Sequence, residues 1–203
     1  MPVRIKVCGV TRPEDAELAV ELGAEMIGLN FYPPSPRSLT LDRAAGIARA
    51  VAGRAMLVGV FVNATRAFVE ERRSALGLGM MQFHGDEADD ELAGWPVPVI
   101  RVLRLKGGAP MPRLDRIRAD YVLFDTFDEK LFGGTGRSRS LDGLGEIDLR
   151  RVFLSGGLGP DNVAAAAALG PYAVDVASGI ESAPGIKDAD KLRSFIFNAK
   201  LSR

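Results

Sequence analysis

Short apolar segments alternate with longer amphipathic or alanine-rich segments along the whole chain of 203 residues. The apolar segments are mostly β-branched or aliphatic and are bounded by Gly, Pro or Asn, which is typical of strands. Strands are predicted at residues 3–9, 26–31, 56–62, 80–82, 97–103, 121–125, 152–154 and 173–177. Strands that alternate with helices in this way predict a parallel sheet.

The segments between these strands have helical patterns. Helices are predicted at residues 13–22, 41–51, 66–76, 86–92, 112–118, 160–169 and 188–199. Residues 141–149 have to hold a further short or irregular helix. Before the first helix, Thr11 and Glu14 have the spacing of a capping box, and Pro13 suits a first helical turn.

Two architectures fit this alternation, a closed (β/α)8 barrel and an open doubly wound sheet. A barrel typically needs ~250 residues and has a lower limit of ~200, so this chain fits only with short loops, and the loops between the predicted elements are short. The residues after the first strand, CGVT, are not the GxGxxG fingerprint of a dinucleotide-binding sheet. We therefore expect an α/β protein with a single (β/α)8 TIM barrel domain over residues 1–203.

Charge and composition narrow the classes of partner. Lys plus Arg and Asp plus Glu number 26 each, so bulk charge gives no reason to expect nucleic acid or an anionic membrane. The amino terminus lacks the apolar run of a signal peptide, and no stretch approaches the roughly 20 apolar residues of a membrane span. One Cys and one His make a Cys/His zinc site implausible, and the lone Cys suits a reducing cytosol. We expect a cytoplasmic protein without a metal.

In such a barrel, active sites form at the carboxyl ends of the strands. Cys8 closes the first strand, where alternation places it with Lys6 on the face that points into the barrel. A cation two residues from a thiol favours the thiolate, which is the basic form. Taken alone, however, a free cysteine is more often a small buried apolar residue.

Two aspartates lie at equivalent places. Asp125 closes the sixth strand, and Asp175 lies near the end of the eighth. A carboxylate that closes an apolar strand is either desolvated and functional, or a cap or ion-pair partner for the next loop. A thiol and a carboxylate that face each other across a barrel mouth make a plausible base and acid, so Cys8 and Asp125 are the candidate catalytic pair.

Glycine-rich turns follow the last two strands. Gly156 and Gly157 follow the seventh strand, and Ser178 and Gly179 follow the eighth. Barrels often bind phosphate there through backbone N–H groups, and glycine lets the backbone approach the anion. One such turn has an ordinary explanation in chain geometry, but the two together favour a phosphate site. The GGTG segment at residues 133–136 is either a flexible connector or a mobile cover that also reaches phosphate.

The loop after the second strand, PPSPR at residues 33–37, is stiffened by proline. It can hold Arg37 for bidentate binding of a carboxylate, although a solvated surface arginine is the default interpretation. His84 follows the fourth strand and is not assigned to catalysis.

Taken in order, these motifs resemble those of phosphoribosylanthranilate isomerases over residues 6 to about 188. The matching motifs are KVCGVT (6–11), SPR (35–37), QFHG (82–85), LFD (123–125), GGTG (133–136), SGGL (155–158) with Asn162, DVASGIE (175–181) and PGIKD (184–188). Each motif alone is weak or moderate, whereas the ordered set is specific.

The resemblance implies an Amadori rearrangement of N-(5-phospho-β-ribosyl)anthranilate to 1-(2-carboxyphenylamino)-1-deoxyribulose 5-phosphate in tryptophan biosynthesis, without a cofactor, by a monomer or homodimer. It implies that Cys8 is the general base, Asp125 the general acid and Arg37 the ligand of the anthranilate carboxylate. It further implies contacts to the sugar or phosphate from Asp175, Gly134, Thr135, Gly157, Ser178 and Gly179.

One segment departs from the family pattern, because RSRSLDG at residues 137–143 replaces the usual FDW after GGTG. The departure leaves the closure of this loop open. Two other interpretations remain: another phosphosugar barrel isomerase, such as that of histidine biosynthesis, against which Cys8 argues, and a barrel that binds a phosphorylated ligand without catalysis.

Overall fold

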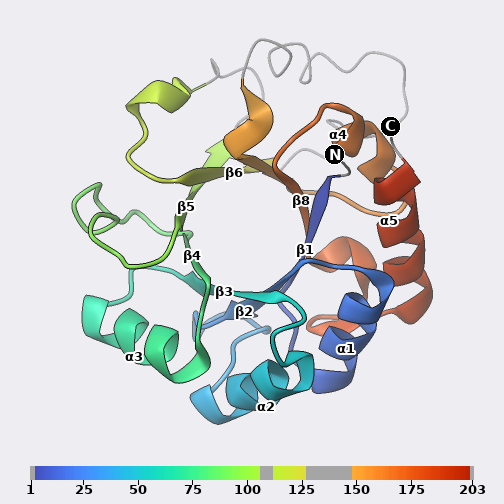
Figure 1. The fold of residues 1–203 in the computed structure, drawn as a ribbon, viewed down its shortest axis with the longest axis horizontal. Coiled ribbons are helices and arrows are strands. Elements are labelled where there is room, and N and C mark those ends of the chain that lie inside the picture. The colour runs from blue at the N-terminus through green and yellow to red at the C-terminus, as the bar shows by residue number, and fades with distance from the viewer. Residues whose placement is uncertain (1–2, 106–111, 127–147, 202–203) are drawn as a thin grey trace.

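The computed structural model describes residues 3–105, 112–126 and 148–201. Within these residues, eight parallel strands close into a barrel in the order of the sequence (Figure 1). The strands are β1 (Arg4–Cys8), β2 (Met26–Asn30), β3 (Met56–Phe61), β4 (Met80–Phe83), β5 (Val99–Leu105), β6 (Tyr121–Thr126), β7 (Val152–Ser155) and β8 (Ala173–Val176). The predicted barrel is confirmed, and the open sheet is excluded because β1 pairs with both β2 and β8.

The helices lie outside the ring of strands (Figure 1). They are α1 (Pro13–Leu22), α2 (Leu41–Val51), α3 (Arg66–Leu76), α4 (Val163–Ala168) and α5 (Ala189–Leu201), with 3₁₀ turns η1 (Leu114–Arg116), η4 (Leu149–Arg151) and η5 (Ser178–Ile180). A short hairpin of β9 (Glu181–Ala183) and β10 (Ile186–Lys187) follows η5. The first three helices have the predicted bounds. The expected helix at residues 141–149 falls mostly outside the described residues.

Two predicted helices are wrong. Residues 86–92 form turns, because the carboxylate of Glu87 accepts hydrogen bonds from the backbone N–H groups of Asn63 (2.7 Å) and Gly85 (2.9 Å). Residues 112–118 form only η1, and Arg113, the residue before it, pairs with Asp115. Residues two positions apart do not share a face of an α-helix, so this pair does not stabilise one. Both segments are far shorter than the ~12–15 residues that a helix needs to be stable without packing.

The start of α1 also differs from its prediction. Arg12 is the N-cap and no side chain caps the helix, because the Thr11 hydroxyl donates to the carbonyl oxygen of Gly185 (2.6 Å). The capping box of Thr11 and Glu14 is therefore wrong, while Pro13 does occupy the first turn. The bond from Thr11 instead ties the loop after β1 to the β9–β10 hairpin.

The strands divide the core into an outer and an inner cluster. Ile5 and Val7 belong to the outer cluster, between strands and helices, whereas Lys6 points into the barrel and is fully buried. The predicted alternation along β1 is thus confirmed. Inside the barrel, large apolar side chains such as Met80 and Phe153 fill the end where the strands begin. Polar side chains therefore gather at the other end, where the strands finish.

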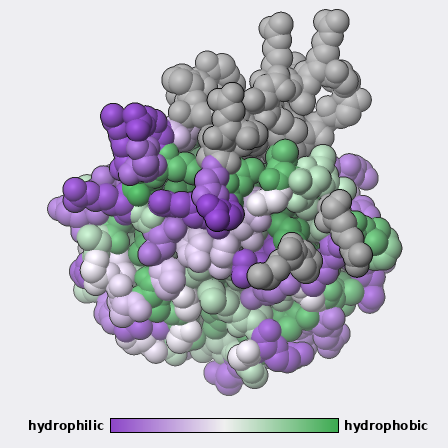
Figure 2. Space-filling model, turned by 45° about the horizontal axis from the view of Figure 1, so that its top comes forward, coloured by the Kyte–Doolittle hydropathy of each residue, from purple (hydrophilic) through white to green (hydrophobic). Residues whose placement is uncertain are grey.

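Helical cover is uneven around this barrel. In the described part of the chain, α1 to α5 flank β1 to β4, β7 and β8, while the connection between β5 and β6 has only η1 (Figure 1). On the face drawn in Figure 2, hydrophilic and hydrophobic residues are intermixed. None of the described helices is both long enough and apolar enough to cross a membrane.

Candidate active site

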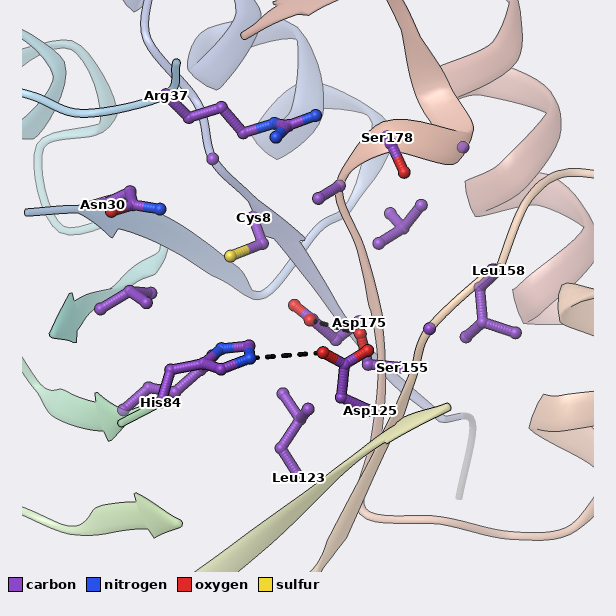
Figure 3. A pocket seen from close by; sticks show the side chains of 18 residues that line it. Cys8, Asn30, Arg37, His84, Leu123, Asp125, Ser155, Leu158, Asp175 and Ser178 are labelled. Atoms are coloured by element: carbon purple, nitrogen blue, oxygen red, sulfur yellow. Dashed lines mark hydrogen bonds and ion pairs between the residues drawn. The ribbon is translucent and has the colours of Figure 1, made fainter. Parts of the chain in front are cut away.

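A cavity of about 430 Å³ lies at the carboxyl ends of the strands. It is lined by every predicted site residue that the structure describes, namely Cys8, Arg37, Asp125, Gly156, Gly157, Asp175, Ser178 and Gly179. Gly134 and Thr135 lie outside the described residues. Side chains from strands far apart in sequence therefore meet in one space (Figure 3).

Cys8 ends β1 and points into this cavity, partly exposed (Figure 3). Its sulfur lies against β2 at Gly28, where an added Cβ would come within 2.8 Å of Sγ, so glycine makes room for the thiol. Burial raises the pKa of the Cys8 thiol, and although Lys6 and Lys187 oppose this, the pKa stays above its ordinary value. The expected effect of Lys6 is present, but burial outweighs it.

Asp175 is held on both oxygens. Lys6 donates to its Oδ1 (2.7 Å) and the Ser155 hydroxyl donates to its Oδ2 (2.9 Å). Burial lowers the pKa of the Lys6 ammonium, but Asp175 and Cys8 together raise it by more, so the pKa lies above its ordinary value. Asp175 thus joins β8 to β1 and to the residue that opens the glycine turn after β7.

Asp125 points into the cavity from β6 and faces a residue that the sequence left unassigned. The Nε2 atom of His84, just after β4, lies 3.3 Å from the Asp125 Oδ2 atom (Figure 3). The His84 carbonyl oxygen accepts a hydrogen bond from Arg104 on β5 (2.9 Å), which fixes the segment that carries the imidazole. The QFHG motif marked His84 in the sequence, but its partner Asp125 lies on β6, so the sequence alone did not pair them.

Arg37 reaches the cavity from the loop after β2. Its side chain passes over Gly9, where a Cβ would lie 2.4 Å from the Arg37 Cδ atom and where φ is +65°. Its guanidinium forms a bidentate pair with Glu181, with Nε to Oε1 at 2.8 Å and Nη2 to Oε2 at 2.5 Å. Only glycine at position 9 therefore lets the arginine lie in this place beside Cys8.

The partner of Arg37 is itself held by a second cation. Lys187 is buried, and its ammonium donates to Glu181 (3.0 Å) and to the carbonyl oxygens of Cys8 (2.7 Å) and Ala177 (3.1 Å). Burial raises the pKa of the Glu181 carboxyl, but Arg37 and Lys187 lower it by more. Two cations thus share one carboxylate, and Arg37, whose side chain is 21% exposed, is the one of the two that lines the cavity. Neither Glu181 nor Lys187 was predicted as a site residue.

The glycine turns after β7 and β8 lie against each other. Gly156 and Gly157 have φ of +85° and +64°, which other residues rarely adopt. A Cβ at Gly179 would lie 1.9 Å from the carbonyl oxygen of Leu158. Both turns therefore require glycine, one for its backbone angles and the other for close approach. Asn162 closes the first turn by donating to the Gly157 carbonyl oxygen (2.9 Å).

A further polar side chain, Gln82 of β4, lines the cavity and was not predicted as a site residue. It is 2% exposed, and among the described residues its Oε1 atom has no hydrogen-bond partner. Over the same part of the chain, no group of three or more His, Cys, Asp or Glu side chains is arranged to hold a metal ion.

The fold and the cavity together define a class of protein: barrel enzymes that act on small phosphorylated ligands at the carboxyl ends of their strands. The comparisons with known sequences identify the family within this class. The family described as N-(5'-phosphoribosyl)anthranilate (PRA) isomerase matches residues 5–198. The chain belongs to this family, so the resemblance drawn from the motifs is confirmed.

Individual relatives in this family are similar in sequence over nearly the whole chain. The N-(5'-phosphoribosyl)anthranilate isomerase of Pseudomonas savastanoi pv. phaseolicola is 45% identical over 197 residues, 96% of each chain. That of Thiobacillus denitrificans is 42% identical over 205 residues and covers 100% of both chains.

Solved structures of this family have the same fold. The phosphoribosyl anthranilate isomerase of Thermus thermophilus superposes with a TM-score of 0.81 at 34% identity, covering 99% of this chain and 100% of its own. Another phosphoribosyl anthranilate isomerase was solved with reduced 1-(o-carboxyphenylamino)-1-deoxyribulose 5-phosphate. It superposes with a TM-score of 0.80 at 35% identity, covering 98% of each chain.

Proposed function

We propose that this chain isomerises N-(5-phospho-β-ribosyl)anthranilate to 1-(2-carboxyphenylamino)-1-deoxyribulose 5-phosphate in tryptophan biosynthesis, by general acid–base catalysis. The observation that carries the mechanism is that Cys8 and Asp125 line the same cavity. Membership of the family supports the reaction, and the solved relative with a reduced aminoketose phosphate supports the class of ligand.

In this mechanism Asp125, protonated, gives its proton to the ring oxygen of the ribose. The bond between C1 and that oxygen breaks, and the nitrogen lone pair forms a protonated Schiff base at C1. Cys8, as the thiolate, removes the proton from C2, and those electrons neutralise the iminium to give an enolamine. The enolamine tautomerises to the aminoketose. The substrate's own nitrogen is the electron sink, so acid and base must begin in opposite protonation states.

The two ends of the substrate have separate binding groups in this proposal. Backbone N–H groups of the turns that contain Gly156, Gly157, Ser178 and Gly179 hold the phosphate, since glycine allows close approach to the anion. Gly134 and Thr135 supply further phosphate contacts. Asp175 positions the first turn through Ser155.

Arg37 binds the anthranilate carboxylate at the other end. The cluster of Arg37, Lys187 and Glu181 has two cations for one carboxylate, and Arg37 is its cavity-lining cation, which supports this role. Glu181 occupies the fork formed by Nε and Nη2, so the substrate carboxylate pairs in this proposal with the second fork, formed by Nη1 and Nη2.

The test is turnover of freshly prepared phosphoribosylanthranilate, followed as loss of its fluorescence. We expect the wild-type protein to consume it and the variants Cys8→Ala and Asp125→Ala to lose about 10²–10⁴-fold in kcat while remaining folded. Binding of inorganic phosphate without turnover by the wild type would instead identify a non-catalytic binding barrel. Near-normal turnover by Cys8→Ala would remove the thiol from the mechanism.

We further propose one domain over residues 1–203 that acts as a monomer or homodimer in the cytoplasm. The lone cysteine supports a reducing compartment. A solved relative from Thermotoga maritima is described as monomers generated from a dimeric enzyme, which supports both oligomeric states for this family. Analytical ultracentrifugation decides between them, and a single cooperative unfolding transition is expected for one domain.

A further inference from the structure

Gln82 places an amide in the wall of the cavity, deep inside the barrel. Along β4, Met80 belongs to the inner cluster and Met81 and Phe83 to the outer one, so alternation turns Gln82 inward. Its neighbours in strand register are Val60 of β3 and Ile100 of β5. Gln82 is therefore a polar group set between apolar neighbours.

The amide oxygen of Gln82 is buried and has no partner among the described residues, which sets it apart from the side chains of Asn30 and Asp175 in the same cavity. Asn30 is engaged at both ends of its amide, with Ser35 and the N–H of Tyr32, and both oxygens of Asp175 accept hydrogen bonds. A buried acceptor without a donor is costly, whereas an apolar side chain of the same shape would be tolerated. A polar side chain at this place indicates a donor that comes from a ligand.

The chemistry of the substrate limits what that donor is. Under the proposed function, the ligand carries a phosphate and a carboxylate, which are acceptors when ionised and repel an amide oxygen. Its hydrogen-bond donors are the ribose hydroxyls and the N–H between the sugar and the aromatic ring. All of them lie in the central part of the molecule, next to the carbons that react.

We propose that Gln82 is a substrate-contacting residue whose amide oxygen accepts a hydrogen bond from a central donor of the substrate, a ribose hydroxyl or the N–H. The inference rests on the proposed function and adds a third point of recognition. Phosphate and carboxylate contacts fix the two ends, and Gln82 fixes the rotation of the reacting centre between Cys8 and Asp125.

The experiment replaces Gln82 by Met, which has a similar length and no amide. The expected result is a fall in kcat/KM of about tenfold or more, because one hydrogen bond to the substrate is lost. The melting temperature stays the same or rises, because the folded protein loses a buried acceptor that has no partner in the described residues. The matched control is Met81→Leu, which changes the neighbouring, outward-facing side chain and is expected to leave kcat/KM unchanged.

Two ligands separate the possible outcomes. Gln82→Met is expected to weaken binding of the reduced product analogue about tenfold and to leave the Kd for inorganic phosphate unchanged, because phosphate has no central donor. Wild-type kcat/KM in Gln82→Met overturns the inference, as does a parallel loss of melting temperature, which would reveal a partner within the protein. A wild-type protein that neither turns over the substrate nor binds the analogue removes the proposed function and this inference together.

Discussion

At the scale of single residues, the ionisation of Cys8 decides how the proposed base works. Burial raises the pKa of its thiol, Lys6 and Lys187 lower it, and Asp175 raises it again. A thiol with a raised pKa is a stronger base once ionised, but a smaller fraction of it is ionised at neutral pH. The activity of this site should therefore depend on pH through Cys8.

Alkylation by iodoacetamide measures that ionisation directly, because the chain contains a single cysteine and only the thiolate reacts. We expect the alkylation rate of the folded protein to keep rising with pH beyond the range where the rate for an ordinary cysteine levels off. In urea-unfolded protein the alkylation rate should level off at a lower pH. If Cys8 is the base, the rise of kcat/KM with pH should follow the rise of the alkylation rate with pH. A rate that is already flat below pH 8 would contradict the raised pKa.

Arg37 gives a second prediction at this scale. Because Glu181 orients the guanidinium by a bidentate pair, Arg37→Ala and Glu181→Gln should each raise KM about tenfold and change kcat less. If Glu181 acts through Arg37, adding Glu181→Gln to Arg37→Ala should have no further effect on KM. Steady-state kinetics of the four proteins measures this cycle. Additive effects would show that Glu181 acts independently, and an unchanged KM in Arg37→Ala would end its assignment to the carboxylate.

The sequence predicts individual site residues best where local position is enough. Cys8 ends β1 and Asp125 is the last residue but one of β6, so the barrel rule alone places them in one cavity, as the structure does. Glu181 was missed because its partner Arg37 is 144 residues away along the chain, and Lys187 because its contact with the Cys8 carbonyl oxygen spans 179 residues. Gln82 was missed because a lack of partners is visible only when the neighbouring strands are in place.

At the scale of elements, packing decided which predictions succeeded. Helices α1, α2 and α3 have ten or eleven residues and begin and end at the predicted residues. Residues 86–92 are too short and acidic to form a helix unaided, and Glu87 is committed to backbone donors outside the segment. Periodicity therefore identifies a helix well when a full apolar face is present and poorly when one or two turns are at stake.

The turns after β7 and β8 act as one element, and Gly179→Ala tests this. A Cβ at position 179 would overlap the carbonyl oxygen of Leu158, which belongs to backbone and cannot rotate away. We expect about 1–3 kcal/mol of destabilisation from overpacking, and at least a tenfold loss of affinity for inorganic phosphate. Urea unfolding and calorimetric titration measure the two effects.

Gly159→Ala is the matched control, since its added Cβ would lie 3.7 Å from the Gly179 carbonyl oxygen, an ordinary contact. It should keep both stability and phosphate affinity. If Gly179→Ala lost stability but bound phosphate normally, the turns would be coupled without forming the phosphate site.

At the scale of the whole molecule, the barrel closes between its first and last strands, and that seam carries a buried ion pair. Lys6 of β1 is fully buried and donates to Asp175 of β8, with which it is in strand register. Asp175 also lines the cavity, so closure of the fold and support of the site depend on the same two side chains.

Breaking this pair on one side leaves a buried charge without its partner, which typically costs about 3–5 kcal/mol. We expect Lys6→Met to lose stability of this order in urea unfolding. Lys6→Met combined with Asp175→Asn should recover most of it, because no charge is then stranded and the amide oxygen still accepts from Ser155. Asp148→Asn, which disturbs an exposed pair with Arg150, is the control and should change stability little. If the double variant were as unstable as the sum of its single changes, Lys6 and Asp175 would stabilise the barrel separately, and the seam would not depend on their pairing.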